Sequence, residues 1–89
     1  MGSAPVVLLT RQGCHLCEEA APLVQGECDA RSIDVEVLDV DADPALREQF
    51  TNHVPVLLVR GVLVDYWRVD AERLRRALDG QPVDPPAPL

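Results

Sequence analysis

The distribution of apolar and polar positions along the chain predicts strands and helices in alternation. An apolar run over Pro5–Thr10 lacks a clean alternation with polar residues, which is typical of a strand buried on both faces. Apolar side chains then recur at helical spacing from Cys14 or His15 onward, which predicts a first helix directly after Gly13. Pro22 lies inside this helix, so the sequence predicts a bend there or a different helix start.

The remaining segments complete an α/β pattern. We expect a strand, a short helix, two strands of a hairpin and a closing helix over Asp34–Val40, Pro44 to about Phe50, Pro55–Arg60, Val62–Tyr66 and Asp70–Asp79, in that order. Asp43 and Asp70 are suitable helix caps, and Gly61 supplies the hairpin turn. The predicted order is therefore β-α-β-α-β-β-α, with a parallel and right-handed first β-α-β unit.

The length of the chain predicts one small domain. Its 89 residues allow only a limited core, and we expect a single domain over residues 1–80. Residues 81–89 contain four of the eight prolines. This composition predicts a flexible, extended tail.

Charge and cysteine usage narrow the cellular context. Fifteen acidic against eight basic residues give a formal net charge of -7, which disfavours nucleic acid as a partner. The amino-terminal region lacks the features of a signal peptide or a membrane span, so we expect no membrane association. Three cysteines, an odd number, fit a reducing compartment better than a secreted disulfide framework. We therefore expect a cytoplasmic protein that acts as a monomer.

Two cysteines carry the candidate chemistry. Cys14 and Cys17 are three residues apart at the start of the first predicted helix, where they share a face. A thiolate of Cys14 would be stabilised by the free N–H groups of that helix end, which lowers a cysteine pKa from about 8.5 toward roughly 3.5 to 7.5. Cys14 is therefore the predicted nucleophile, and Cys17 is the predicted resolving thiol.

Two other interpretations of the cysteine pair remain open. As half of a zinc site, the pair would need two more ligands, and Cys28, His53 and His15 do not have the spacing of a second ligand pair. Both cysteines could also be small buried apolar residues. Cys28 is eleven residues beyond Cys17 along the helix, too far for a disulfide without unwinding, so we expect it to be structural or an incidental surface thiol.

The local sequence resembles the thioredoxin superfamily and, within it, the glutaredoxin-like proteins. The segments Thr10–Ala20 and His53–Val56 carry the resemblance, which extends over residues 5 to 79. It is closest to a small bacterial branch with a Cys-His-Leu-Cys motif. The resemblance implies a thioredoxin fold with a four-stranded mixed sheet and three helices. It also implies an enzyme, a dithiol oxidoreductase that reduces disulfides of proteins or small molecules through Cys14 and Cys17.

The resemblance also implies a substrate site around the dithiol. It implies a cis peptide at Val54–Pro55, which faces the dithiol and leaves the backbone of Val54 free to pair with an extended substrate. The alternative is a trans proline that opens an edge strand. Arg11 stands where glutaredoxins place a basic residue for a glutathione carboxylate, and a protonated His15 would favour the Cys14 thiolate. Arg11, His15, Val54 and Pro55 are thus the predicted substrate-binding residues.

The chain departs from glutathione-using glutaredoxins at two points. The centre of its motif is His-Leu rather than Pro-Tyr, and Asp65–Asp70 lacks the expected Gly-Gly. Both glutathione and a flavoprotein reductase therefore stay open as electron donors, and we expect no bound cofactor. The alternative function is a binding module or a carrier of a thiolate-bound metal or iron–sulfur cluster, where a bridging cluster would require a dimer. We expect Trp67 to pack in the core or at its rim, His53 to be a solvated loop residue, and Asp70 to cap a helix.

Overall fold

The order of secondary structure follows the predicted pattern. The computed structural model describes residues 4–50 and 52–86. Its elements are β1 (Val6–Thr10), α1 (His15–Asp29), β2 (Val35–Asp39), the short 3-10 helix η1 (Val40–Ala42), α2 (Pro44–Phe50), β3 (Val56–Val59), β4 (Val62–Tyr66) and α3 (Ala71–Leu78). The predicted β-α-β-α-β-β-α order is confirmed, and η1 is an addition that the pattern did not indicate. No helix among the described residues is long and apolar enough to cross a membrane.

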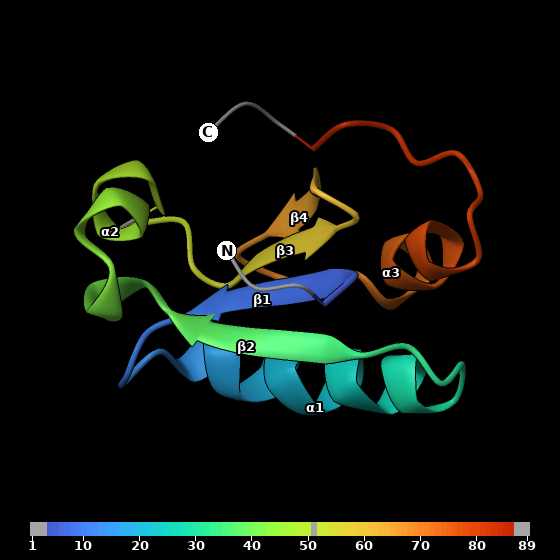
Figure 1. Cartoon of the computed structure of the whole chain (residues 1–89), viewed down its shortest axis with the longest axis horizontal. Helices are drawn as coiled ribbons and strands as arrows, with labels where there is room; N and C mark the ends of the chain where they lie inside the picture. Colours follow the sequence, from blue (N-terminus) through green and yellow to red (C-terminus); the bar gives the residue numbers. More distant parts are fainter. Residues whose placement is uncertain (1–3, 51, 87–89) are drawn as a thin grey trace.

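The four strands form one mixed sheet in the order β2-β1-β3-β4, in which β1 is parallel to β2 and antiparallel to β3. Helices α1 and α3 cover one face of the sheet and α2 lies on the other (Figure 1). Alternate residues of β1 therefore enter two different cores: Leu8 packs in the α1 and α3 layer, and Leu9 packs with Phe50 of α2. This burial on both faces explains why β1 lacks an apolar and polar alternation.

Pro22 does not interrupt α1, which runs without a break from His15 to Asp29. A proline in a helix interior removes the hydrogen bond to the carbonyl four residues earlier, here that of Glu18, and costs about 3 kcal/mol in an unfavourable context. Both Pro22 and Glu18 lie on the exposed side of α1, where water can satisfy the freed carbonyl. The helix start at His15 agrees with the sequence prediction.

The segment after α3 packs against the domain, whereas the sequence predicted a domain that ends at residue 80 and a flexible tail. Residues 81–86 have no regular secondary structure, yet Val83 packs against the core cluster under α3. The Arg73 guanidinium donates hydrogen bonds to the carbonyls of both Val64 and Asp84, which ties this segment to β4. The segment predicted as a tail is thus held to the domain as far as Asp84, because the Val83 side chain packs against the core and the Asp84 carbonyl accepts a hydrogen bond. Residues 1–3, 51 and 87–89 lie outside the described residues.

An ion-pair network joins the carboxyl ends of α1 and α3. Arg31 Nε donates to Asp79 Oδ1 at 2.8 Å, and Arg31 Nη1 donates to Glu27 Oε1 at 2.9 Å. The other oxygen of Glu27 accepts from Arg75 Nε at 3.0 Å. These hydrogen bonds lower the pKa of Glu27, mainly through Arg31 and then Arg75, and Arg31 lowers the pKa of Asp79. The network holds together the end of the helix pair that is remote from the cysteine motif.

We predict that Arg31→Gln lowers the melting temperature near neutral pH, and that this difference shrinks in acid. A carboxylate whose pKa is lowered by folding stabilises the fold fully above its unfolded pKa, here near 4.5 for Glu27 and 3.8 for Asp79. That stabilisation is lost as the pH falls through the lower folded pKa. Thermal unfolding measured by circular dichroism between about pH 7 and about pH 3 tests this.

Arg76→Gln is the matched control, because Arg76 pairs with Glu72 in an exposed i,i+4 pair on α3. We expect a smaller loss than for Arg31→Gln, since exposed single pairs contribute little. A loss in Arg31→Gln that stays constant down to about pH 3 would contradict the role of the network.

Candidate functional site

Cys14 caps the amino-terminal end of α1. Its backbone is extended (φ -87, ψ 109), and its Sγ accepts a hydrogen bond from the N–H of Cys17 at 3.1 Å. Gly13 has a φ of +75, which only glycine adopts without strain, and this turn leads β1 into the helix. The Cys14 N–H donates to the Arg11 carbonyl at 3.3 Å, which closes the turn. The sulfur of Cys14 thus lies where the helix presents unpaired N–H groups, as the sequence predicts.

Cys14 and Cys17 form a disulfide, with their Cα atoms 5.2 Å apart. The two residues differ in access. Cys17 is 5% exposed and belongs to the core, whereas Cys14 is only partly buried. An incoming thiol or disulfide therefore reaches the sulfur of Cys14 more readily than that of Cys17. The roles of nucleophile for Cys14 and resolving thiol for Cys17 stay predictions.

The Val54–Pro55 bond is cis, the isomer that the resemblance implies. Val56 pairs with Leu9 in the antiparallel register of β3 and β1. The preceding residue, Pro55, therefore stands at the end of the sheet where β1 leads into Gly13 and Cys14. Pro55 is fully buried and Val54 partly so. Val54 and Pro55 thus lie at the same end of the sheet as the dithiol.

Arg11 does not lie open to solvent as an isolated cation. Its Nε and Nη2 donate to Asp41 Oδ2 and Oδ1 at 2.9 and 2.8 Å. The hydrogen bond between them lowers the pKa of the Asp41 carboxyl and raises that of the guanidinium. Sequence reasoning identified Arg11 and missed Asp41. The two residues are 30 positions apart, and only the η1 turn after β2 brings them together.

His15 projects into solvent. Its side chain is 85% exposed, with Nδ1 and Nε2 each 4.0 Å from a carboxylate oxygen of Glu18 and Glu19 respectively. Those carboxylates are the neighbours of His15 on the outer face of α1. The role predicted for His15 toward the Cys14 thiolate stays a prediction.

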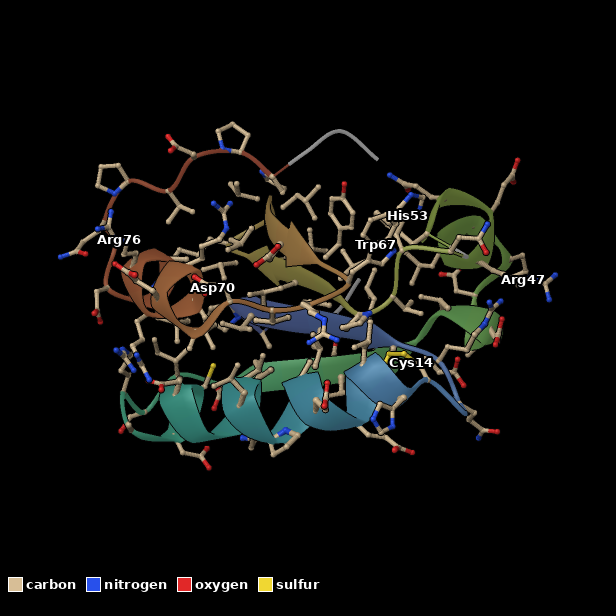
Figure 2. All side chains as sticks on the ribbon, turned by 180° about the vertical axis from the view of Figure 1, so that it is seen from behind. Cys14, Arg47, His53, Trp67, Asp70 and Arg76 are labelled. Carbon is tan, nitrogen blue, oxygen red and sulfur yellow. A yellow bond between two sulfur atoms is a disulfide. The ribbon has the colours of Figure 1, made fainter. Side chains whose placement is uncertain are left out.

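Three rings pack together near the cis proline. Trp67 stacks on His53 with ring centroids 6.0 Å apart, and Tyr66 contacts Trp67 edge-to-face at 5.0 Å. Trp67 has a φ of 63, and its backbone N–H donates to the Pro55 carbonyl at 2.9 Å. Figure 2 shows the positions of Trp67, His53 and Cys14. Its indole N–H donates to the Asn52 carbonyl at 2.8 Å. Trp67 therefore holds the loop before β3 through both its backbone N–H and its indole N–H.

This cluster corrects one expectation and agrees with another. His53 is half-buried against two aromatic rings rather than solvated, and its Nδ1 has no hydrogen-bond partner among the described residues. Trp67 packs at the rim, as predicted, and keeps 51% of its surface exposed. The contacts of His53 with Tyr66 and Trp67 have no signal in the local sequence, because His53 precedes β3 whereas Tyr66 and Trp67 lie at and after the end of β4.

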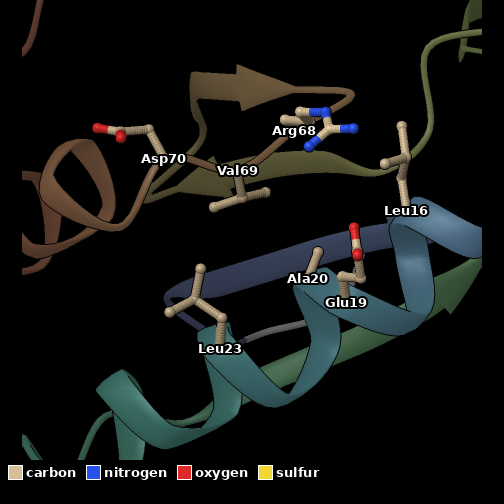
Figure 3. A pocket seen from close by; sticks show the side chains of 7 residues that line it. All are labelled: Leu16, Glu19, Ala20, Leu23, Arg68, Val69 and Asp70. Carbon is tan, nitrogen blue, oxygen red and sulfur yellow. The ribbon is translucent and has the colours of Figure 1, made fainter.

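A groove of about 330 Å³ lies between α1 and the segment before α3 (Figure 3). Its lining consists of Leu16, Glu19, Ala20, Leu23, Arg68, Val69 and Asp70. Leu16 lies between the two cysteines in the sequence, but neither Cys14 nor Cys17 lines the groove. Asp70 caps α3, as predicted, by accepting a hydrogen bond from the Arg73 N–H at 2.9 Å. Arg68 and Val69 therefore form one wall of the groove in the stretch that lacks the Gly-Gly of glutaredoxins.

The third cysteine is separate from the dithiol. Cys28 is a fully buried free thiol in the core beneath α1 and α3, and burial raises its pKa. Within residues 4–50 and 52–86, no group of three or more His, Cys, Asp or Glu side chains is arranged to hold a metal ion. Cys28 is thus a core residue, in agreement with the structural role expected for it.

Comparison with known proteins places this site in a family. The model of the glutaredoxin-like domain family (DUF836) matches residues 5–79. The chain belongs to the glutaredoxin-like family. Uncharacterized proteins of Mycobacterium tuberculosis and Mycobacterium bovis are each 36% identical to it over 93 aligned positions, which cover 94% of this chain and 96% of theirs. The predicted family is therefore confirmed.

Solved structures confirm the fold of this glutaredoxin-like chain. A structural genomics target protein from X. campestris is 35% identical, with a TM-score of 0.69 and coverage of 86% of this chain and 99% of that one. A protein from Nitrosomonas europaea is 25% identical with a TM-score of 0.66, covering 83% and 89%. Thioredoxin 1 from Thermosipho africanus shares the fold at 19% identity, with a TM-score of 0.64 and coverage of 84% and 90%. The thioredoxin fold and its cysteine pair support a redox-type function.

We predict that the three thiols of the reduced protein react in a fixed order with iodoacetamide. Cys14 should be alkylated first, because it is the accessible sulfur at a helix amino terminus, and Cys17 should follow more slowly. Cys28 should react at least about tenfold more slowly than Cys14 until denaturant opens the core. Peptide mass spectrometry over a time course measures the order. Alkylation of Cys28 in the native protein at the rate of Cys14 would contradict this structure of the site.

Proposed function

We propose that this protein is a thiol-disulfide oxidoreductase in which Cys14 is the nucleophile and Cys17 the resolving thiol. The observation that carries the proposal is the position of Cys14 Sγ, which accepts the Cys17 N–H at the first turn of α1. In the reduced protein the same N–H stabilises a thiolate on Cys14, the form that attacks disulfides. The greater exposure of Cys14 than of Cys17 supports Cys14 as the residue that makes the first attack.

The reaction passes two electrons from the protein to its substrate. The Cys14 thiolate attacks one sulfur of a substrate disulfide, and the other substrate sulfur leaves as a thiolate that takes up a proton. Cys17 then loses its proton and attacks Cys14 Sγ in the mixed disulfide. This step releases the second substrate thiol and forms the Cys14–Cys17 disulfide, the oxidised state present in the structure. The substrate is reduced and the dithiol is oxidised.

Surfaces on the dithiol side of the molecule support a polypeptide or peptide disulfide as substrate. The backbone of Val54 lies at the sheet end next to the dithiol loop, in a place suited to pairing with an extended chain. The groove that begins at Leu16 offers an apolar floor for a neighbouring substrate residue. Return of the dithiol to its reduced form requires a two-electron donor, either two molecules of glutathione or a flavoprotein reductase, as in the reducing cytoplasm.

Reduction of a protein disulfide tests the proposal directly. Dithiothreitol should reduce insulin faster in the presence of the wild-type protein, and Cys14→Ser should return the rate to that of dithiothreitol alone. Cys17→Ser should accumulate a mixed disulfide on Cys14 that mass spectrometry detects, because the resolving thiol is gone. Cys28→Ala is the matched control and should keep the wild-type rate, since Cys28 is buried in the core.

Two results would contradict the proposal. The first is a wild-type protein that does not accelerate insulin reduction and whose Cys14–Cys17 disulfide no thiol reduces. The second is a protein that purifies with stoichiometric zinc or iron, bound through Cys14 and Cys17, which would favour the metal-carrier alternative. Metal analysis of the purified wild type and of Cys14→Ser separates these cases.

A further inference from the structure

Arg11 and Asp41 form an ion pair near the dithiol that has no role in the proposed oxidoreductase mechanism. We propose that Asp41 sets the specificity of the site for the incoming thiol, by acting as an internal carboxylate that occupies Arg11. Thiols that carry carboxylates, such as glutathione, then gain little from Arg11, and neutral thiols or protein dithiols are favoured by comparison. This inference rests on the proposed function and names the class of reductant that the site accepts.

The geometry of the pair is that of a carboxylate bound by an arginine. Two parallel N–H donors of Arg11, Nε and Nη2, each meet one oxygen of Asp41, at 2.9 and 2.8 Å. This bidentate arrangement uses the planar fork with which a guanidinium binds the carboxylate of a ligand. A ligand carboxylate that approached the same edge of Arg11 would have to displace Asp41.

Asp41 is held in place by its own backbone. Its N–H donates to Asp39 Oδ1 at 2.9 Å, which caps the η1 turn between β2 and α2. On the other side of the pair, the Arg11 carbonyl accepts the Cys14 N–H. The two charged side chains therefore extend from two turns that are each closed by a hydrogen bond. This arrangement places Asp41 as an internal competitor for Arg11.

The pair is close to the route of an incoming thiol. Arg11 lines the same shallow depression as Cys14, Cys17 and Glu18, next to the edge strand β2. The side chains of Arg11 and Asp41 are 32% and 39% exposed, so both remain in contact with solvent and with a small ligand. Asp39 adds a second negative charge that acts on Arg11. An anionic thiol that enters this depression thus meets an Arg11 whose charge is compensated by Asp41. It also meets the negative charges of Glu18 and Asp39.

The affected step is the reduction of the oxidised dithiol. A thiolate attacks Cys14 Sγ, the sulfur of Cys17 leaves as a thiolate that takes up a proton, and a mixed disulfide remains on Cys14. A second thiol attacks this mixed disulfide and releases Cys14, so that two thiols are oxidised to one disulfide and the protein gains two electrons. The rate of the first attack measures how well the site accepts each thiol.

The test compares glutathione with 2-mercaptoethanol, a neutral thiol, as reductants of the wild type and of Asp41→Asn. We expect the ratio of the two rate constants to shift toward glutathione by about threefold in Asp41→Asn, which is the size expected for a solvent-exposed pair. Rates are measured by acid quench, alkylation of free thiols and mass spectrometry. High salt should diminish the shift, since it screens exposed charges.

Asp43→Asn is the matched control. It removes the same charge from the same connection, and asparagine can still cap α2 at the Ala45 N–H that Asp43 now binds. The ratio should change by much less than in Asp41→Asn, because Asp43 does not pair with Arg11. The double variant Asp41→Asn/Arg11→Met should return the ratio to the wild-type value, since the gain requires the Arg11 guanidinium.

The rate ratios of the three variants decide whether Asp41 sets the preference for the incoming thiol. An unchanged ratio in Asp41→Asn, or an equal shift in Asp43→Asn, would overturn it and assign the pair a role only in holding the turn before Cys14. A gain that persists after Arg11→Met would overturn it as well. These results would leave the oxidoreductase function intact if both thiols still reduce the disulfide. Failure of both thiols to reduce the wild type would overturn the function and the inference together.

Discussion

The hydrogen bond from the Cys17 N–H to the sulfur of Cys14 is the interaction on which this site depends. It exists because β1 ends in a turn at Gly13 and α1 begins directly after Cys14, so that the sulfur takes the position of a helix cap. A capping serine or aspartate would only stabilise the helix, whereas a cysteine there gains a stabilised anion that can attack sulfur. In the proposed mechanism, the start of α1 thus provides both the helix cap and the reactive group.

The rest of the fold keeps that turn in place. β1 is buried on both faces, between α1 and α3 on one side and α2 on the other, so its end cannot shift without disturbing two cores. The loop before β3 is fixed by Trp67, and the loop before Cys14 by the Arg11–Asp41 pair. Two interactions therefore hold the loops at this end of the sheet: the hydrogen bonds of Trp67 hold the loop before β3, and the Arg11–Asp41 ion pair holds the loop before Cys14.

The sequence predicted what depends on local pattern and spacing. The strands, the helices, the start of α1 and the cap at Asp70 follow from periodicity and capping chemistry, and the Cys14–Cys17 pair from its place after a strand. The Arg11–Asp41 pair and the stacking of His53 on Trp67 could not be predicted, because each joins residues that only the tertiary fold brings together. The contact of Val83 with the core was missed for the same reason, since proline content describes a segment and not what it touches.

The central claim is that the start of α1 makes Cys14 a stabilised thiolate. The most direct measurement is the rate of alkylation of Cys14 as a function of pH in the reduced protein, with Cys17→Ser used to isolate the single thiol. We expect Cys14 to titrate well below the ordinary cysteine pKa of about 8.5, within the range of roughly 3.5 to 7.5. A Cys14 that titrates at or above about 8.5 would contradict it.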